Sequence, residues 1–199
     1  MANAPGVPYV PNEEVYAGIT KLALEGFDKG LDPIQIMETA WDAMPDFPMH
    51  CPEHHYLTAA ALLAAYRRLN GDDKQQLDHD LAIALGRARN VLGGFCGFYG
   101  ACGAAIGAGI FLSVFTNTTP YSTDTWQDTT GITAFCLQRI SDLGGPRCCK
   151  RVCYTAANAA AEYMREHFQL DAKLPDELKC HRHDRNKECI KEQCPYYEK

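Results

Sequence analysis

The segment from residue 50 to residue 71 reads HCPEHHYLTAAALLAAYRRLNG, and it decides the fold class. Pro52 suits the first turn of a helix, and the alanines and leucines that follow it favour a helix over a strand. Asn70-Gly71 is typical of a helix end. The segment therefore predicts one long helix rich enough in alanine and leucine to supply a core.

Helix signals continue on both sides of this segment. Asn12 precedes an acidic pair and predicts the start of a helix that runs to about Phe27. Asp32 precedes a proline and predicts a second helix to about Met44. Residues 74–92 keep the apolar spacing of a helix face. Strand signals are scarce, so the pattern indicates an all-α protein.

Two more helices are expected in the second half of the chain, at 131–142 and 146–168. The stretch TNTTPYSTDTWQDT before the first of them is polar and predicts a loop. Gly144-Gly145-Pro146 separates the two helices.

A glycine-rich stretch in the middle of the chain carries no charge. No Asp, Glu, Lys or Arg occurs from Asn90 through Thr123, and seven glycines fall between residues 93 and 109. The apolar part, 104–115, is too short for a membrane span, although small residues at this spacing also serve helix packing in membranes. We expect a buried, closely packed central helix and no membrane association.

The composition is that of a globular domain. Hydrophobic residues make up 46% of the chain and charged residues 22%, while the net charge of -6 argues against nucleic acid as a partner. MANAPGVPYVPNEE lacks the pattern of a signal peptide, which predicts a cytoplasmic protein. We expect a helical bundle around the Gly/Ala-rich helix in three parts: a disordered arm at 1–11, a cysteine-rich helical domain at 12–175, and a Cys/His metal-binding tail at 176–199.

Ten cysteines and seven histidines set this chain apart. A secreted disulfide framework is one explanation, but such frameworks belong to smaller chains with poor cores. In a reducing cytosol the combination indicates metal ligation or thiol chemistry.

Several cysteines lie at predicted helix starts, where free N–H groups and the helix dipole favour a thiolate. We expect these thiols to converge as catalytic or cofactor-binding groups, unless they merely pack as small apolar side chains. The catalytic and cofactor-binding candidates are Cys51, Cys102, Cys149 and Cys153, with Cys148 as a further cofactor ligand. Cys96 and Cys136 stay undecided.

His54 and His55 follow Cys51 at positions i+3 and i+4, so all three can share one helix face. Imidazole with thiolate suits zinc, iron or copper, or a thiol activated by a base. We therefore add both histidines to the catalytic candidates. The alternative is that they only form hydrogen bonds in a cleft.

The C-terminal tail carries a second set of metal-ligand residue types. Cys180, Cys189 and Cys194 occur within fifteen residues, with His183 between them and Pro195 after the last. Three thiolates and one imidazole complete a tetrahedral zinc site, and a cysteine followed by proline is also typical of ferredoxin clusters. A disulfide with one spare thiol is the remaining alternative. We predict that these four residues bind a metal that holds the tail in place.

Four stretches together carry a family resemblance: HCPEHHYLTAAALLAAYRR, CGFYGACGAAIGAG, CCKRVCY and NKECIKEQCPYYEK. In this order they resemble an uncharacterised family of cysteine-rich domains of anaerobic bacteria and archaea, sometimes joined to methyltransferase or radical-SAM domains. More distantly, the chain is similar to the redox-active family named for its C–GCAxxG–C–C pattern, through Cys51, Cys102-Gly103-Ala104, Gly107-Ala108, Cys149 and Cys153. That likeness implies a helical fold with a redox-active cysteine cluster or an iron–sulfur centre. The histidines at 54 and 55 and the cysteine tail have no counterpart in the redox pattern.

These observations predict an iron–sulfur or dithiol redox protein that passes electrons or sulfur to a partner in anaerobic metabolism. The cofactor would be an iron–sulfur cluster of the 4Fe-4S type, zinc, or both. The partner would be a redox, methyltransferase or radical-SAM enzyme, and a homodimer is left open. One alternative is a zinc or iron enzyme that uses Cys51, His54 and His55. Another is a zinc-stabilised binding module without chemistry.

Overall fold

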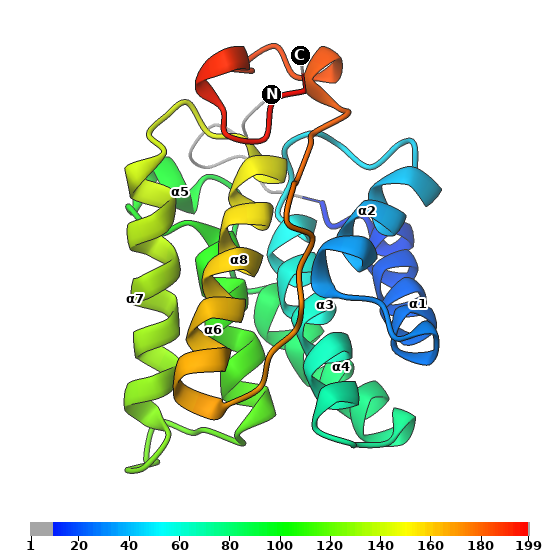
Figure 1. Ribbon diagram of the computed structural model, residues 1–199, viewed down its shortest axis with the longest axis vertical. Coiled ribbons are helices and arrows are strands. Elements are labelled where there is room, and N and C mark those ends of the chain that lie inside the picture. The colour runs from blue at the N-terminus through cyan, green and yellow to red at the C-terminus, as the bar shows by residue number, and fades with distance from the viewer. Residues whose placement is uncertain (1–9, 199) are drawn as a thin grey trace.

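The computed structural model describes residues 10–198, so most of the predicted arm at 1–11 lies outside the described residues. Within that range the chain forms eight α-helices, two short 3-10 helices and no β-strand (Figure 1). The predicted all-α fold is confirmed. The α-helices are α1 (Glu13–Lys29), α2 (Pro33–Ala43), α3 (Glu53–Leu69), α4 (Lys74–Ala88), α5 (Phe95–Phe98), α6 (Gly103–Phe115), α7 (Trp126–Asp142) and α8 (Cys149–Phe168).

The first two helices begin where the sequence predicts. The side chain of Asn12 accepts a hydrogen bond from the backbone N–H of Val15 at the start of α1. Asp32 and Gln35 form a capping box at the start of α2, in which each side chain bonds to the backbone of the other residue. These caps satisfy N–H groups that a helix leaves free at its first turn.

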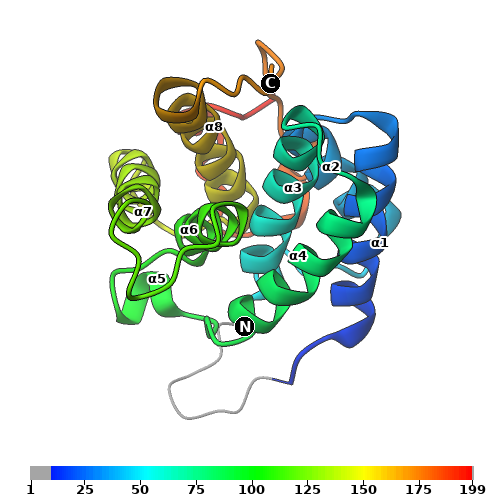
Figure 2. The ribbon, with the colours of Figure 1, turned by 90° about the horizontal axis from the view of Figure 1, so that it is seen from below.

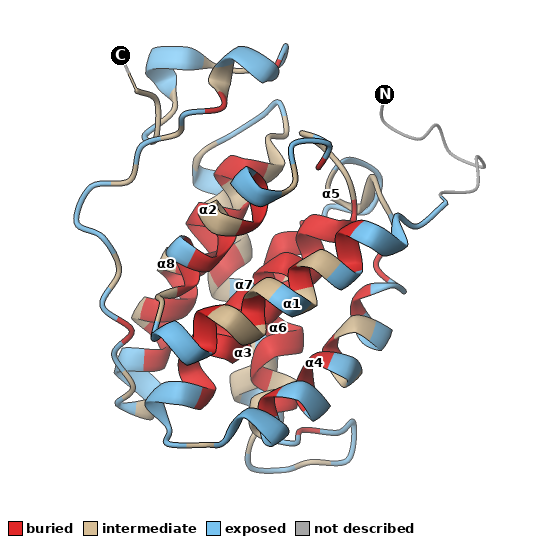
Figure 3. Cartoon of the chain, turned by 90° about the vertical axis from the view of Figure 1, so that its right-hand side faces the viewer, coloured by how far each residue is buried: buried red, intermediate tan, exposed pale blue. Residues whose placement is uncertain are grey.

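Two helices form the centre of the bundle. In α3, every residue from Glu53 to Arg67 is buried, and α6 is buried along most of its length (Figure 3). Seen along the helices, α3 and α6 lie side by side, with α1, α2 and α4 around α3, and α7 and α8 beside α6 (Figure 2). A helix that is apolar on all sides is a core helix. The predicted central helix is thus buried, but it shares the centre with α3.

Glycine lets these two helices approach closely. A Cβ atom at Gly107 would lie 2.5 Å from the backbone oxygen of His55, and one at Gly103 would lie 2.1 Å from the His55 ring. Any larger side chain at either position would push α6 away from α3. Among residues 10–198, no helix is both long enough and apolar enough to span a membrane.

The structure differs from the sequence prediction in two places. The short helix α5 was not expected, and α7 begins at Trp126, inside the predicted loop. Threonine hydroxyls in the first turns of α7 donate to backbone oxygens four residues earlier, as Thr129 does to Thr125. Such bonds occur in loops as well as in helices, which explains why the polar pattern misled the prediction.

After α8 the chain runs back along the bundle and returns to the end where α3 and α8 begin (Figure 1). There it forms the 3-10 turns His183–Arg185 and Lys191–Gln193 and a single bridge between Cys180 and Tyr197. The tail therefore covers the end of the bundle that carries Cys51 and Cys149.

Candidate functional site

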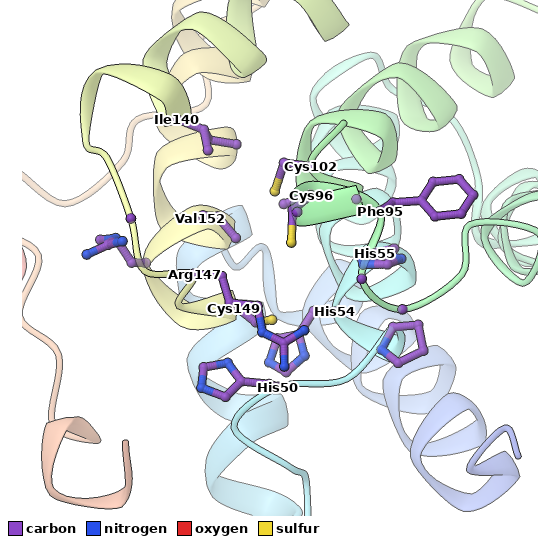
Figure 4. A pocket seen from close by; sticks show the side chains of 18 of the residues that line it. His50, His54, His55, Phe95, Cys96, Cys102, Ile140, Arg147, Cys149 and Val152 are labelled. Atoms are coloured by element: carbon purple, nitrogen blue, oxygen red, sulfur yellow. The ribbon is translucent and has the colours of Figure 1, made fainter. Parts of the chain in front are cut away.

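A cavity of about 440 Å³ lies at this end of the bundle. Its wall comes from the beginnings of α3, α6 and α8, from α5, and from the end of α7 (Figure 4). Titratable groups on the wall are Cys51, Cys96, Cys102, Cys149, His50, His54, His55, Arg147 and Arg151. A cavity of this size accommodates a small cofactor.

Three of the predicted thiols meet in this cavity because each lies at a helix start. Cys51 comes two residues before α3, Cys102 is the N-cap of α6, and Cys149 is the first residue of α8. Backbone N–H groups reach two of the sulfurs: those of Ala104 and Ala105 lie at Cys102, and that of Cys51 lies at Cys149. The structure thus brings together residues that are up to 98 positions apart in the sequence.

Cys96 adds a fourth thiol to the same cavity. It lies on α5, between the glycines of the loop and next to Cys102, and its sulfur points into the cavity on the side of Cys149 in Figure 4. No helix signal in the sequence precedes Cys96, so the sequence alone does not decide its role.

The other cysteines of the helical domain lie elsewhere. Cys153 is fully buried one turn behind Cys149 and does not line the cavity; its sulfur lies 3.4 Å from the hydroxyl of Thr58, which donates to it. Cys136 is buried between α7 and α8 and donates to the backbone oxygen of Ala156. Cys148, the neighbour of Cys149, faces a different cavity beneath the tail.

The sequence predicts lowered pKa values for the thiols at the helix starts, and for Cys51, Cys102 and Cys149 this prediction is wrong. Burial raises the pKa of Cys149 to about 12. Burial also raises the pKa of Cys102, although the N–H groups at the start of α6 lower it. Burial raises the pKa of Cys51 as well, and the negative charge of Glu53 raises it further. Desolvation outweighs the helix N-terminus here, so these thiols carry their protons. A bound metal reverses this balance, because a coordinating thiol loses its proton.

His54 connects Cys51 to a buried lysine. The Nζ of Lys150 lies 2.8 Å from Nε2 of His54, and Nδ1 of His54 lies 3.2 Å from the sulfur and 3.1 Å from the backbone oxygen of Cys51. Burial, followed by Lys150, lowers the pKa of His54 well below its ordinary value. The ring is therefore neutral, accepts from Lys150 at Nε2, and carries its proton on the nitrogen that faces Cys51.

His55 has the opposite orientation. Its Nδ1 lies 2.9 Å from the backbone oxygen of Val91, which can only accept, so Nδ1 carries the proton. Burial lowers its pKa, which keeps the ring neutral and leaves a lone pair on Nε2. This nitrogen lies on the Gly103 side of the ring, at the cavity wall. The two histidines thus differ. Both ring nitrogens of His54 form hydrogen bonds, whereas the lone pair on Nε2 of His55 can bind a ligand.

Two buried cations stand next to each other behind Cys149. Lys150 and Arg151 are 1% and 3% exposed. Lys150 lies over the rings of Trp41 and Phe47, and burial lowers its pKa to about 8. Arg151 donates to the backbone oxygens of Gly144 and Pro146, and its Nε has no hydrogen-bond partner within the described chain.

Neither cation forms an ion pair with a carboxylate in the part of the chain that the structure describes. The carboxylate of Glu53 raises the pKa of the Cys51 thiol and accepts a hydrogen bond from the backbone N–H of Asn12. Buried charges of this kind are costly unless an anion compensates them.

The predicted ligands of the tail line a second, much smaller cavity of about 20 Å³. Cys180, Cys189, Cys194 and His183 lie on its wall, together with Cys148 from the start of α8. Over residues 10–198, no group of three or more His, Cys, Asp or Glu side chains is arranged so that it could hold a metal ion. The tail itself docks through Arg182, which bonds to the carboxylates of Glu38, at 2.7 Å, and of Asp42.

The fold and the cavity together define an all-helical, cysteine-rich domain. Residues 19–197 match the family of unknown function DUF5714, and because the match covers most of the chain, the protein belongs to that family. No curated protein and no solved structure matches the chain.

Proposed function

We propose that the protein is an electron carrier that binds an iron–sulfur cluster in the 440 Å³ cavity and serves a partner redox, methyltransferase or radical-SAM enzyme. The observation that carries this proposal is the meeting of Cys51, Cys102 and Cys149, from three helix starts, in one cavity with Cys96. Four thiolates are the usual ligand set of a 4Fe-4S cluster.

The charges around the cavity support an anionic occupant. A cluster bound by four thiolates is negatively charged. Arg151 lines the cavity and Lys150 lies behind His54, and neither cation pairs with a carboxylate within residues 10–198. The N-termini of α3, α6 and α8 add partial positive charge at the same place. The lowered pKa of Lys150 reflects the cost of burying its charge, and a bound anion would offset that cost.

The thiol pKa values favour ligation over dithiol exchange. A dithiol centre attacks through an accessible thiolate of low pKa. Here burial raises the pKa of Cys51, Cys102 and Cys149. All ten cysteines are free thiols, which agrees with the reducing cytoplasm that we propose for this protein.

Cys51, Cys96, Cys102 and Cys149 would hold the cluster, which would supply one-electron transfer between a reduced donor protein and an acceptor without a change in the covalent bonds of the chain. The role of His54 in this process is positioning. Its N–H lies towards the sulfur of Cys51, and such bonds tune the potential of a cluster. Lys150 fixes the ring in that orientation.

A docking surface for the partner lies next to Cys96. Leu92, Phe98 and Tyr99 are 56%, 55% and 74% exposed, and they flank the segment that carries Phe95 and Cys96. Exposed apolar side chains in one place are typical of interaction sites. An acceptor bound there would lie close to the cavity.

Protein purified without oxygen tests the proposal. We expect a brown colour, broad charge-transfer absorption, and iron with acid-labile sulfide. The variants C51S, C102S and C149S should lose most of the iron, whereas C136A should keep it because Cys136 does not line the cavity. Colourless protein that contains only zinc would overturn the proposal, as would unchanged iron in the three variants.

One observation favours a second candidate, a zinc or iron enzyme. Nε2 of His55 has a lone pair at the cavity wall, and its other nitrogen donates to a backbone oxygen, as in many metal-binding histidines. With Cys51 it could hold a single catalytic ion, but His54 could not, because both of its nitrogens are engaged. A metal content of one ion that falls in H55A, without labile sulfide, would favour this candidate.

A further inference from the structure

Adjacent cysteines at the start of α8 serve different cavities. Cys149 lines the large cavity, while Cys148, the N-cap of the helix, lines the small one beneath the tail. Three tail cysteines, at positions 180, 189 and 194, line that same small cavity. The sequence places Cys148 more than thirty residues before the first of them, so only the fold brings the four together.

We propose that Cys148, Cys180, Cys189 and Cys194 form a four-thiolate site for one zinc-sized divalent ion, with Cys148 rather than His183 as the fourth ligand. This site is separate from the large cavity and does not depend on the function proposed for it. Four sulfurs suffice for the tetrahedron that zinc prefers.

The size of the small cavity fits one ion. Its volume of about 20 Å³ compares with about 440 Å³ for the large one. A space of roughly 10–15 Å³ on this scale holds a single water molecule. One atom therefore fits where a cluster of several irons and sulfides does not.

Cys148 lies close to its proposed partners. It shares the wall of one cavity of about 20 Å³ with Cys180, Cys189 and Cys194. Four thiolates around so small a space would repel one another, and a cation between them removes that repulsion. On binding, the ion displaces one proton from each thiol to solvent, so a divalent ion and four thiols give a centre of net charge -2 and four protons.

Two arginines supply the charge that such a centre requires. Arg151 and Arg182 are 3% and 5% exposed and both line the small cavity. Arg182 already bonds to the carboxylates of Glu38 and Asp42. Arg151 bonds only to backbone oxygens in the described chain, and its Nε has no partner there. Arg151 lines both cavities, so its charge can offset part of the negative charge of a four-thiolate centre here as well as that of an anion in the large cavity.

The thiols must close around the ion, because zinc-bound sulfurs at about 2.3 Å from the metal lie only about 3.8 Å apart. The tail can make this movement, since it consists of 3-10 turns and loop rather than a regular helix. Metal binding would then fasten the last residues of the chain to the first turn of α8, which also positions Cys149.

Zinc-dependent protection from alkylation tests the site in the full chain. Reduced, metal-free protein is treated with iodoacetamide with and without one equivalent of zinc, and each cysteine peptide is quantified by mass spectrometry. We expect zinc to slow alkylation of Cys180, Cys189 and Cys194 at least tenfold. C148S should abolish this protection, whereas H183N should keep it. Circular dichroism verifies that the helices of C148S are intact.

C194S provides a second test, because its substitution lies outside the helical bundle and should still remove the protection of Cys180 and Cys189. Three results would overturn the proposal: no protection by zinc in the wild-type protein, protection that survives C148S but not H183N, or iron with labile sulfide bound by these four cysteines. None of these results depends on the content of the large cavity.

Discussion

At the scale of single residues, the site depends on groups that are costly to bury. Lys150 is held by Nε2 of His54, by the backbone oxygen of Pro48 at 3.4 Å, and by the rings of Trp41 and Phe47. None of these partners is a carboxylate. Lys150 lies behind His54 and Cys149, which line the cavity, so under the proposed function a bound anion would offset part of the cost of burying its charge.

Replacing Lys150 by Met separates binding from folding. Methionine keeps most of the apolar volume and removes the charge, so the stability of the metal-free protein at pH 7 should stay within about 1 kcal/mol of the wild type or rise. Iron retention after anaerobic purification should fall several-fold. Urea unfolding and iron analysis measure the two effects, and a variant that keeps full iron content would contradict the role of the cation.

The buried thiol of Cys136 makes stability depend on pH. Burial raises its pKa to about 12 in the folded protein, against an ordinary value near 9. Below pH 9 the folded and the unfolded states both keep the proton, and the stability linked to the raised pKa is fully present. As the pH rises from 9 towards 12, only the unfolded state loses the proton, so the free energy of unfolding falls. The whole fall is about 4 kcal/mol, at roughly 1.4 kcal/mol per pH unit.

C136A should therefore lose stability less steeply than wild type between pH 8 and 10.5, after a loss of about 1–2 kcal/mol at neutral pH from the small cavity that it leaves. Urea midpoints of the metal-free, reduced proteins measure both slopes. The effect of Lys150 is common to the two proteins and cancels in the comparison. Parallel slopes would show that Cys136 does not cause the dependence.

At the scale of helices, the contact between α3 and α6 holds the site in place. His55 on α3 lies against Gly103 and Gly107 on α6, so the separation of the two helices sets where its ring faces the cavity. The same contact carries Cys102 towards Cys51, because these residues lie at the beginnings of the two helices.

G107A should destabilise the protein by about 1–3 kcal/mol, because its Cβ would meet the backbone oxygen of His55 at 2.5 Å. Gly86 on α4 is the matched control, since a Cβ there has no neighbour within 4 Å. G86A should stabilise by about 0.5–1 kcal/mol. Thermal unfolding measures both changes, and equal shifts in the two variants would refute the close contact as the reason for glycine.

The helices were predictable where local chemistry decides them. Asn12 and Asp32 cap α1 and α2 as their sequences suggest. The convergence of Cys51, Cys102 and Cys149 on one cavity could be predicted because a helix start is a local signal, while their role stays a prediction. The positions of Cys148 and Cys153 could not be predicted, because the rotation of α8 about its axis and the return of the tail decide which way each sulfur faces.

At the scale of the whole molecule, the tail closes the end of the bundle that holds the site. Arg182 bonds to Glu38 across 144 residues of sequence, and Tyr196 packs on Tyr154 with ring centroids 5.1 Å apart. His50, on the wall of the large cavity, lies 3.1 Å from the side-chain oxygen of Asn186 in the tail. The order of the tail therefore affects the wall of the cavity.

R182A should release the tail, because it leaves Glu38 partly buried without its cation. In limited proteolysis of the metal-free protein, the segment 179–198 should be cut several-fold faster than in the wild type. Within residues 10–198, Arg185 donates only to the backbone oxygen of Pro45 at the surface, so R185A serves as the control and should change little. Similar cleavage rates in both variants would contradict the role of Arg182.

Anomalous diffraction from crystals grown without oxygen tests the central claim most directly. Data collected on both sides of the iron absorption edge should give a strong peak in the cavity bounded by Cys51, Cys96, Cys102 and Cys149. A map with no iron peak there, from protein that contains iron elsewhere or only zinc, would contradict the claim.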